Sequence, residues 1–221
     1  LSTTEWAAEI SDHLDLYRIT NLVTVPTGVD EILSQLQEQF QFYIWWHEKE
    51  ATVKLKTVRG LDATPPTLTE ATGVQAGSYS TKEYPRARSS QVWVYFDPLD
   101  YTSGRKDPAT YQSLRIWADL DSEGDNANGS QSIRKIYGNW LTKAFMTRKI
   151  GKKLLNKYKD VPREVTIRVD AKDRDLWTGD VIKLDHYREI DQYGARDIRT
   201  WLIVSAEEVR PGEVVEYVMQ D

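Results

Sequence analysis

The last third of the chain carries a regular alternation of apolar and polar residues. Val165, Ile167 and Val169 are separated by Thr166 and Arg168, and this period of two gives a strand one buried face and one exposed face. Further runs rich in β-branched and aromatic residues follow, divided by turn-forming residues: 181–184, 198–205 and 214–219. The pattern predicts a small β-barrel that contains no catalytic motif.

Upstream of this region, helical and strand patterns are mixed. Thr27 and Asp30 are typical of a helix cap, and apolar residues at three- and four-residue spacing continue to Phe40. A second helix, 141–158, is apolar on one side and carries six Lys or Arg residues elsewhere. Strands are expected at 17–25, 42–46, 51–58, 91–96, 113–120 and 132–137. Residues 60–84 show no sustained period and predict a long surface loop.

These elements indicate an α+β, mostly β fold in two small domains. A chain of 221 residues is long enough for two modest cores. We expect a first domain at 1–138, with the long loop at 60–84, and a second at 139–221, formed by the basic helix and the barrel. Because the chain begins with Leu rather than Met, we also expect a processed product or part of a longer protein.

Composition narrows the classes of partner. The formal net charge is −5, with both signs interspersed, so we predict no binding of nucleic acid. No apolar run approaches the roughly 18 residues of a membrane-spanning helix, so no membrane insertion by this segment is expected. The absence of cysteine excludes disulfides and thiolate metal sites. Eight Trp and twelve Tyr residues suit protein interfaces, although most are expected to fill thin β cores.

One acidic segment resembles the front half of a calcium loop. Asp119, Asp121 and Glu123 occupy alternate positions before Gly124. The twelfth position of that frame is Ser130, where a bidentate glutamate is required. The ligand set is therefore incomplete, and we predict a solvated acidic loop.

The remaining candidates for catalysis have simpler structural interpretations. The three histidines, His13, His47 and His186, adjoin carboxylates, but neighbours on a strand point to opposite faces, so surface or turn histidines are expected. A series of aspartates falls in predicted turns, where aspartate bonds nearby backbone amides: Asp170, Asp173, Asp175 and Asp180. We therefore assign no catalytic, cofactor-binding or metal residue, and predict that the protein is not an enzyme.

The order and spacing of several segments resemble the central hub proteins at the tail tip, or baseplate, of long-tailed bacteriophages. The segments are Val25–Asp30, Phe42–Glu48, Val53–Arg59, Arg88–Tyr95, the basic helix and Thr178–Ile182. The resemblance spans nearly the whole chain and implies a structural component of the virion, assembled in the host cytoplasm. It also implies a homotrimer that joins other phage tail proteins to close the tail tube. Some members bind a metal cluster through cysteines, which this chain lacks.

A second hypothesis is an envelope carbohydrate-binding or polysaccharide-degrading module. It depends on four tryptophans near carboxylates that could offer flat surfaces to sugars: Trp45, Trp46, Trp93 and Trp117. A cleft with converging carboxylates and a facing Trp would favour this hypothesis, whereas a flat aromatic patch would favour assembly.

Overall fold

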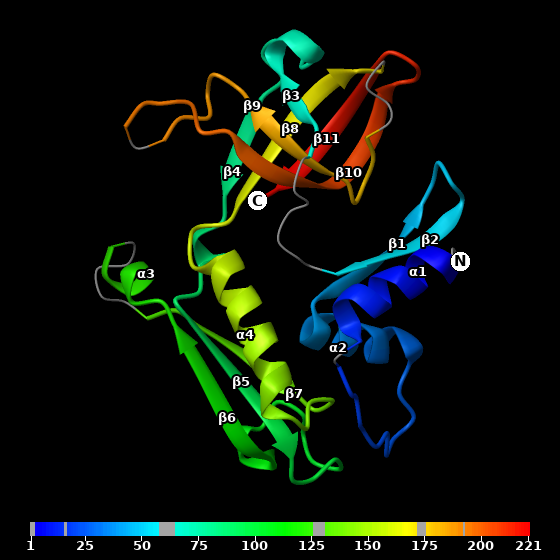
Figure 1. Cartoon of the computed structure of the whole chain (residues 1–221), viewed down its shortest axis with the longest axis vertical. Helices are drawn as coiled ribbons and strands as arrows, with labels where there is room; N and C mark the ends of the chain where they lie inside the picture. Colours follow the sequence, from blue (N-terminus) through cyan, green and yellow to red (C-terminus); the bar gives the residue numbers. More distant parts are fainter. Residues whose placement is uncertain (1–2, 16, 58–64, 126–130, 172–175, 192) are drawn as a thin grey trace. The chain divides into compact units, whose positions relative to one another are not determined.

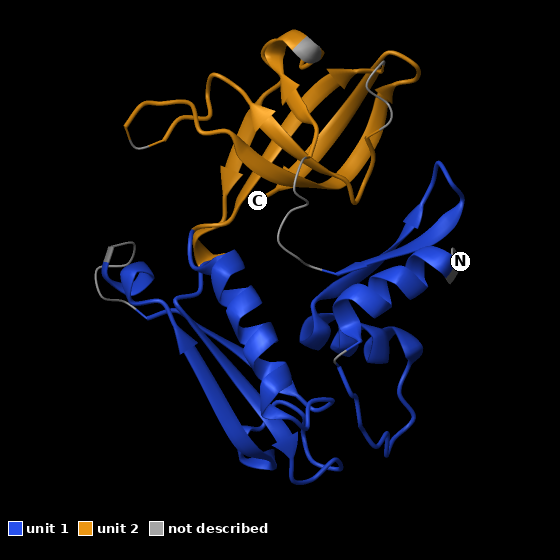
Figure 2. Ribbon diagram, in the orientation of Figure 1, with its two compact units in different colours: residues 1–59, 88–160 blue, residues 60–87, 161–221 orange. Residues whose placement is uncertain are grey.

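The chain divides into two compact units, and it passes between them three times. The computed structural model describes residues 3–15, 17–57, 65–125, 131–171, 176–191 and 193–221. Unit 1 comprises residues 1–59 and 88–160, and unit 2 comprises residues 60–87 and 161–221 (Figure 2). The fold is α+β and mostly β, as the sequence predicts.

Unit 1 contains a two-stranded hairpin and a three-stranded sheet, each with helices against it (Figure 1). Its first segment forms α1 (Thr3–Glu9), the π-helix η1 (Ile10–Leu14), α2 (Val29–Phe40), β1 (Phe42–His47) and β2 (Thr52–Thr57). Its second segment forms β5 (Gln91–Pro98), the 3-10 turn η4 (Pro108–Thr110), β6 (Tyr111–Ala118), α3 (Leu120–Asp125), β7 (Ile133–Gly138) and α4 (Ala144–Tyr158).

Helix α4 covers one face of the sheet β6-β5-β7 (Figure 1). Val92 and Val94, two residues apart on the central strand β5, are completely buried with Met146 and Ile150, four residues apart on α4. Alternate residues of the strand therefore pack against residues one turn apart on the helix, and together these side chains form the core of this part of unit 1.

One glycine allows the helix and the sheet to approach closely. Gly151 lies on the buried side of α4, and a Cβ added there would overlap the indole ring of Trp117 on β6. Gly124, in α3, has open space around the corresponding position.

We predict that Gly151→Ala destabilises unit 1 by about 1–3 kcal/mol, although alanine is the better helix former, because the packed Trp117 ring must shift. Gly124→Ala is the matched control and should be neutral or slightly stabilising. Urea unfolding followed by circular dichroism measures both. Equal stability of the two variants would contradict this account of the packing.

Helix α2 is joined to the β7–α4 connection by a buried amide network. Gln39, with no exposed surface, donates to Asn139 Oδ1 at 2.5 Å and accepts from the Trp140 backbone N–H at 3.1 Å. Gln35 accepts from Asn139 Nδ2 and from Trp140 Nε1, each at 3.1 Å. These directed bonds fix the orientation of α2, because a buried amide without its partners would be costly.

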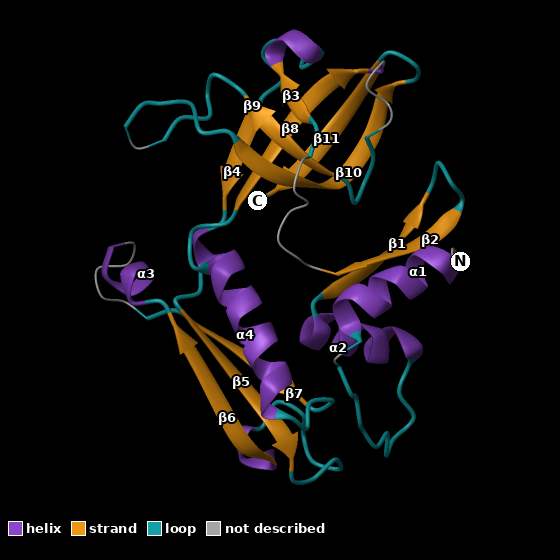
Figure 3. Cartoon of the chain, viewed as in Figure 1, coloured by secondary structure: helices purple, strands orange, loops and turns teal. Residues whose placement is uncertain are grey.

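Unit 2 is a curved six-stranded sheet in the order β3-β9-β10-β11-β8-β4 (Figure 3). The bounds are β3 (Thr67–Thr69), η2 (Glu70–Thr72), β4 (Ser80–Glu83), η3 (Pro85–Ala87), β8 (Arg163–Asp170), β9 (Val181–Asp185), β10 (Arg199–Arg210) and β11 (Val214–Gln220). Val165, Ile167 and Val169 are fully buried, so the alternation in the sequence is confirmed. They share a core with side chains of the neighbouring strands: Leu68, Ile182, Leu184, Trp201, Ile203, Val215, Tyr217 and Met219.

Part of the predicted surface loop at 60–84 belongs to this sheet. Strand β3 pairs in parallel with β9, and β4 pairs antiparallel with β8, so the two segments are the edge strands of the six. Residues 60–64 lie outside the described residues. The units also differ from the division expected at residue 138, because α4 packs on the sheet of unit 1 and residues 65–87 complete the sheet of unit 2.

The strand predicted at 17–25 does not form. Residues 17–24 have no regular secondary structure, and Ile19, Leu22 and Val25 expose half or more of their surface. An apolar run becomes a strand only where a partner strand supplies hydrogen bonds, and no strand in the described part of the chain pairs with this segment. The predicted side-chain cap at Thr27 is also wrong, because α2 begins after Gly28 without one. No helix in the described part of the chain is long and apolar enough to cross a membrane.

Candidate functional site: a buried polar cluster beneath an exposed connection

The connection between β9 and β10, residues 186–198, projects several large apolar side chains into solvent. Tyr193 is 84% exposed, and Tyr187, Ile190 and Ile198 each expose more than half of their surface. The described residues of the connection are nevertheless held by bonds of their own, since Asp191 Oδ1 accepts from the backbone N–H groups of residues 193 and 195 at 2.8 and 2.9 Å. An ordered loop that exposes aromatic and aliphatic side chains has the composition of an interaction surface.

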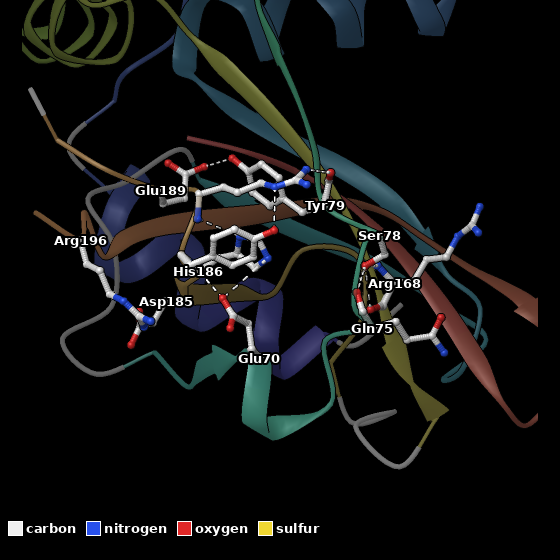
Figure 4. Close-up of polar contacts among 11 residues, drawn as sticks. Glu70, Gln75, Ser78, Tyr79, Arg168, Asp185, His186, Glu189 and Arg196 are labelled. Carbon is white, nitrogen blue, oxygen red and sulfur yellow. Dashed lines mark hydrogen bonds and ion pairs between the residues drawn. The ribbon is translucent and has the colours of Figure 1, made fainter. Parts of the chain in front are cut away.

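A buried carboxylate lies at the base of this connection. Glu189 is 2% exposed and accepts a short hydrogen bond from the phenol of Tyr79 (Figure 4). Its other oxygen lies 3.4 Å from Nη1 of Arg163, at the start of β8. A buried carboxylate is tolerated only with such partners, so Glu189 holds the connection to two other segments of unit 2.

A histidine stacks on the same tyrosine. His186 is 4% exposed, and its ring lies 4.4 Å from that of Tyr79, nearly parallel to it. Nε2 lies 3.9 Å from a carboxylate oxygen of Glu70 (Figure 4). Burial lowers the pKa of His186, and the positive charges of Arg188 and Arg196 act in the same direction, while Glu70 and Glu189 oppose them. His186 is therefore neutral near pH 7.

A second set of bonds fixes the segment that carries Tyr79. Ser78 Oγ donates to the carbonyl of Gln75 at 2.7 Å and accepts from the backbone N–H of Arg168 at 3.1 Å (Figure 4). The N–H of Gln75 donates to the carbonyl of Arg168 at 2.8 Å. The chain leading to Tyr79 is thus bonded directly to β8, so its ring is held in place from both sides.

The chemistry of this cluster suits support better than catalysis. Burial and the hydrogen bond to Glu189 raise the pKa of Tyr79 to about 12, so its phenol remains protonated at neutral pH. A general base or acid works best with a pKa near the operating pH and a free route to substrate. Here the tyrosine donates to Glu189 and the histidine ring stacks on the tyrosine. The cluster positions the 186–198 connection.

We predict that Glu189→Ala lowers the free energy of unfolding of unit 2 by about 3 kcal/mol, because it leaves Arg163 and the Tyr79 phenol without their buried partner. Glu189→Gln retains an acceptor and should lose about half as much. Glu83→Ala, on the exposed strand β4, is the control and should change stability by less than about 0.5 kcal/mol. Thermal and urea unfolding measure all three. If the free energy of unfolding of Glu189→Ala equals that of wild type, the carboxylate does not hold the connection.

A pH dependence follows from His186. Since the pKa of His186 in the folded chain lies below the ordinary histidine value of 6.5, the unfolded chain binds a proton first as the pH falls. Stability contributed by neutral His186 is therefore present above pH 6.5 and is lost as the pH decreases from there toward the folded pKa. We predict that the stability difference between wild type and His186→Phe falls between pH 7.5 and 5.5, by at most about 1.4 kcal/mol per unit. A pH-independent difference would contradict the burial of a neutral ring.

Unit 1 contains a hollow of about 170 Å³ between the 21–27 segment, α2 and the β5–β6 connection. Two carboxylates line it, Glu31 and Asp100, together with Arg105, Tyr101 and Trp140. Hydrogen bonds from Ser103 and Thr102 lower the pKa of Asp100 to about 2, which is opposite to the shift that a general acid requires. Glu31 accepts a bond from Gln35 at 3.3 Å. Asp100 is therefore not prepared to act as a general acid.

The acidic segment at 119–123 is engaged by the protein itself. It leads into and forms part of helix α3 rather than the predicted loop. Asp119 lies 3.7 Å from the ammonium of Lys159, and Glu123 accepts from Gln91 Nε2 at 2.7 Å. Within the described ranges, no group of three or more His, Asp or Glu side chains is arranged to hold a metal ion.

The other sequence candidates are separated in the structure. His47 accepts a backbone N–H from Glu50 in the β1–β2 turn at 3.3 Å, and His13 lies in η1. His186 is buried rather than at the surface, but it begins a turn in which the backbone N–H of Glu189 donates to its carbonyl at 2.9 Å. Asp180 accepts the Trp177 N–H at 2.8 Å, which confirms its predicted turn role. Asp173 and Asp175 lie outside the described residues.

The four tryptophans of the carbohydrate hypothesis do not form one platform. Trp45 and Trp46 are adjacent on β1 and point to opposite faces. Trp117 pairs with Val92 and faces α4, whereas Trp93 pairs with Ile116 on the opposite face of the sheet. The residues that do converge, Tyr79, Arg163 and Glu189, carry no local sequence signal, since Tyr79 and Glu189 are 110 residues apart.

The fold is shared with proteins of virions and phage tails. A chain from the virion of a native gene transfer agent particle matches 88% of this chain with a TM-score of 0.57 and 14% identity. The 43 kDa tail protein of prophage MuSo2 from Shewanella oneidensis matches 89% with a TM-score of 0.51 and 16% identity. A tail protein from Neisseria meningitidis MC58 matches 90% with a TM-score of 0.52 and 14% identity.

These likenesses concern the fold, because the identities are low. The chain spans 40%, 56% and 57% of the length of the three proteins, respectively. No protein-family model and no curated protein matches the sequence. These three proteins are tail and virion proteins, which agrees with the resemblance of the sequence to phage tail proteins.

Proposed function

We propose that this chain is a structural component of a phage tail, present in the virion. The observation that carries the proposal is the fold shared over 88–90% of the chain with tail and virion proteins from separate sources. Both units are included at that coverage, so the likeness extends beyond a common sheet. The finer proposal is a hub-like protein at the tail tip, which assembles in the host cytoplasm with copies of itself, as a homotrimer, and with other tail proteins to close the tube.

Two features of the described surface support an assembly role. The 186–198 connection exposes Tyr187, Ile190 and Tyr193 while Glu189 fixes its base. On the sheet of unit 1, Leu114 and Ile116 are 40% and 51% exposed on the face opposite α4. Exposed apolar side chains on ordered elements are typical of surfaces that become buried in a complex.

The carbohydrate-binding alternative has less support. Its tryptophans lie on different strands and faces, and the pKa of Asp100, which lines the unit 1 hollow, is lowered. We propose that purified chain is not retained on envelope polysaccharide and releases no reducing sugar from it. Retention that is lost on Trp140→Ala would instead support a sugar site in the hollow.

The decisive experiment is analysis of particles. We predict that gradient-purified particles contain the chain, by mass spectrometry, in a small fixed number of copies, and that immunogold labelling places it at the end of the tail distal to the head. Deletion of the reading frame should yield particles without complete tails. Particles with normal tails that lack the chain would overturn the proposal, and label distributed along the tail would overturn the tip assignment alone.

A further inference from the structure

The outer face of α4 is a cationic stripe. Phe145, Arg148, Lys149, Lys152 and Asn156 are the exposed positions of the helix, and their spacing of three and four residues places them on one side. The opposite side packs on the sheet of unit 1 (Figure 1). Helix α4 contains no acidic residue among its 15.

The cations of this stripe repel one another. Arg148 and Lys152 are separated by four residues and Lys149 and Lys152 by three, and like charges at these spacings destabilise a helix. Among the described residues, no carboxylate lies within ion-pair distance of Arg148, Lys149 or Lys152, and the ammonium of Lys149 lies 6.0 Å from the centre of the Tyr17 ring. A helix that keeps three such cations beside the 52% exposed Phe145 is prepared for an acidic partner.

Acidic side chains occupy both faces of the end of the β10–β11 hairpin in unit 2. Glu207, Glu208 and Glu213 are exposed there, with Arg210 as the single cation of residues 205–217. Glu207 pairs directly across the strands with Glu216, an arrangement that is unfavourable for like charges. Arg168 compensates Glu216 at 2.8 Å. Glu207 and Glu208 have no ion pair of this kind among the described residues.

We propose that the cationic stripe of α4 in one copy binds the acidic end of the β10–β11 hairpin in a second copy. The inference rests on the proposed function, because it requires that copies of the chain associate. Each surface lacks what the other provides, and complementary charge gives both specificity and faster association. A chain with a net charge of −5 repels its copies at long range, and a local cationic surface opposes that repulsion.

The two surfaces lie on different units, so the contact is heterologous. A heterologous contact generates a ring where its rotation closes and a filament where it does not. Each copy would use its stripe on one neighbour and its hairpin on the other. This head-to-tail contact would hold together the closed homotrimer of the proposed function.

Charge reversal tests the contact without impairing the fold. Lys149→Glu gives Lys153 an opposite charge four residues away, and Glu207→Lys faces Glu216 across the strands, so both changes favour the isolated chain. The stripe variant carries Lys149→Glu and Lys152→Glu, and the hairpin variant carries Glu207→Lys and Glu208→Lys. A control variant for the stripe, Arg86→Glu with Lys106→Glu, changes the net charge equally at exposed positions elsewhere.

Sedimentation velocity at low salt is the measurement. Wild type and the control variant should associate as concentration rises, and high salt should weaken this association. The stripe and hairpin variants should each associate about tenfold more weakly, whereas their mixture should form a mixed complex. A single chain with all four changes should recover self-association.

Three results would overturn the inference. Wild type could remain monomeric, or both variants could associate as strongly as wild type. The two variants could also fail to form a mixed complex, which is the result expected if the contact forms within one chain. Binding of a DNA duplex by wild type that is lost only in the stripe variant, with self-association intact, would also overturn it. None of these results bears on the location of the chain, which the analysis of particles decides. If the two variants form a mixed complex but the chain is absent from particles, the tail role is refuted while the contact between copies stands.

Discussion

Unit 2 depends on the alternation of buried side chains in β8. A shift of one residue would turn Val165, Ile167 and Val169 to solvent and Thr166 and Arg168 to the core, so the register with β11 is strongly specified. That register places β4 on the free edge of β8 and brings the segment of Tyr79 alongside it. The buried polar cluster and the connection that it supports are consequences of this one strand pairing.

The cluster shows how a mostly apolar sheet can hold a precise loop. Burial removes the water around the Glu189 carboxylate, and contacts with Tyr79 and Arg163 replace the lost interactions. These two residues come from separate segments of unit 2. Such a network is satisfied in only one arrangement, so it selects a conformation more sharply than apolar packing does. The exposed Tyr193 and Ile190 are thereby presented on a defined framework, and an ordered surface loses less conformational entropy when a partner binds.

The sequence predicts what depends on local period. The alternation in β8, the hairpin β1–β2 and the amphipathic α4 all follow from spacing of apolar residues, and the structure has each of them. The sequence does not predict pairing between distant segments. Residues 17–25 have the composition of a strand but no neighbour, whereas the Thr- and Ser-rich β3 and β4 become strands because β9 and β8 offer them free edges. The polar residues next to Glu189 in the sequence give no sign that it is buried. Its buried partner, Tyr79, is remote in the chain.

The threefold passage of the chain between the units has a consequence during translation. Residues 67–69 and 80–83 leave the ribosome long before 183–185 and 163–166, the stretches with which they pair. Meanwhile the ribosome synthesises the whole second segment of unit 1, residues 88–160. The early strands therefore lack these partners until all of unit 1 has been synthesised. The two strands carry one large apolar side chain, that of Leu68, and such a composition lowers the tendency of an unpaired strand edge to adhere to other chains.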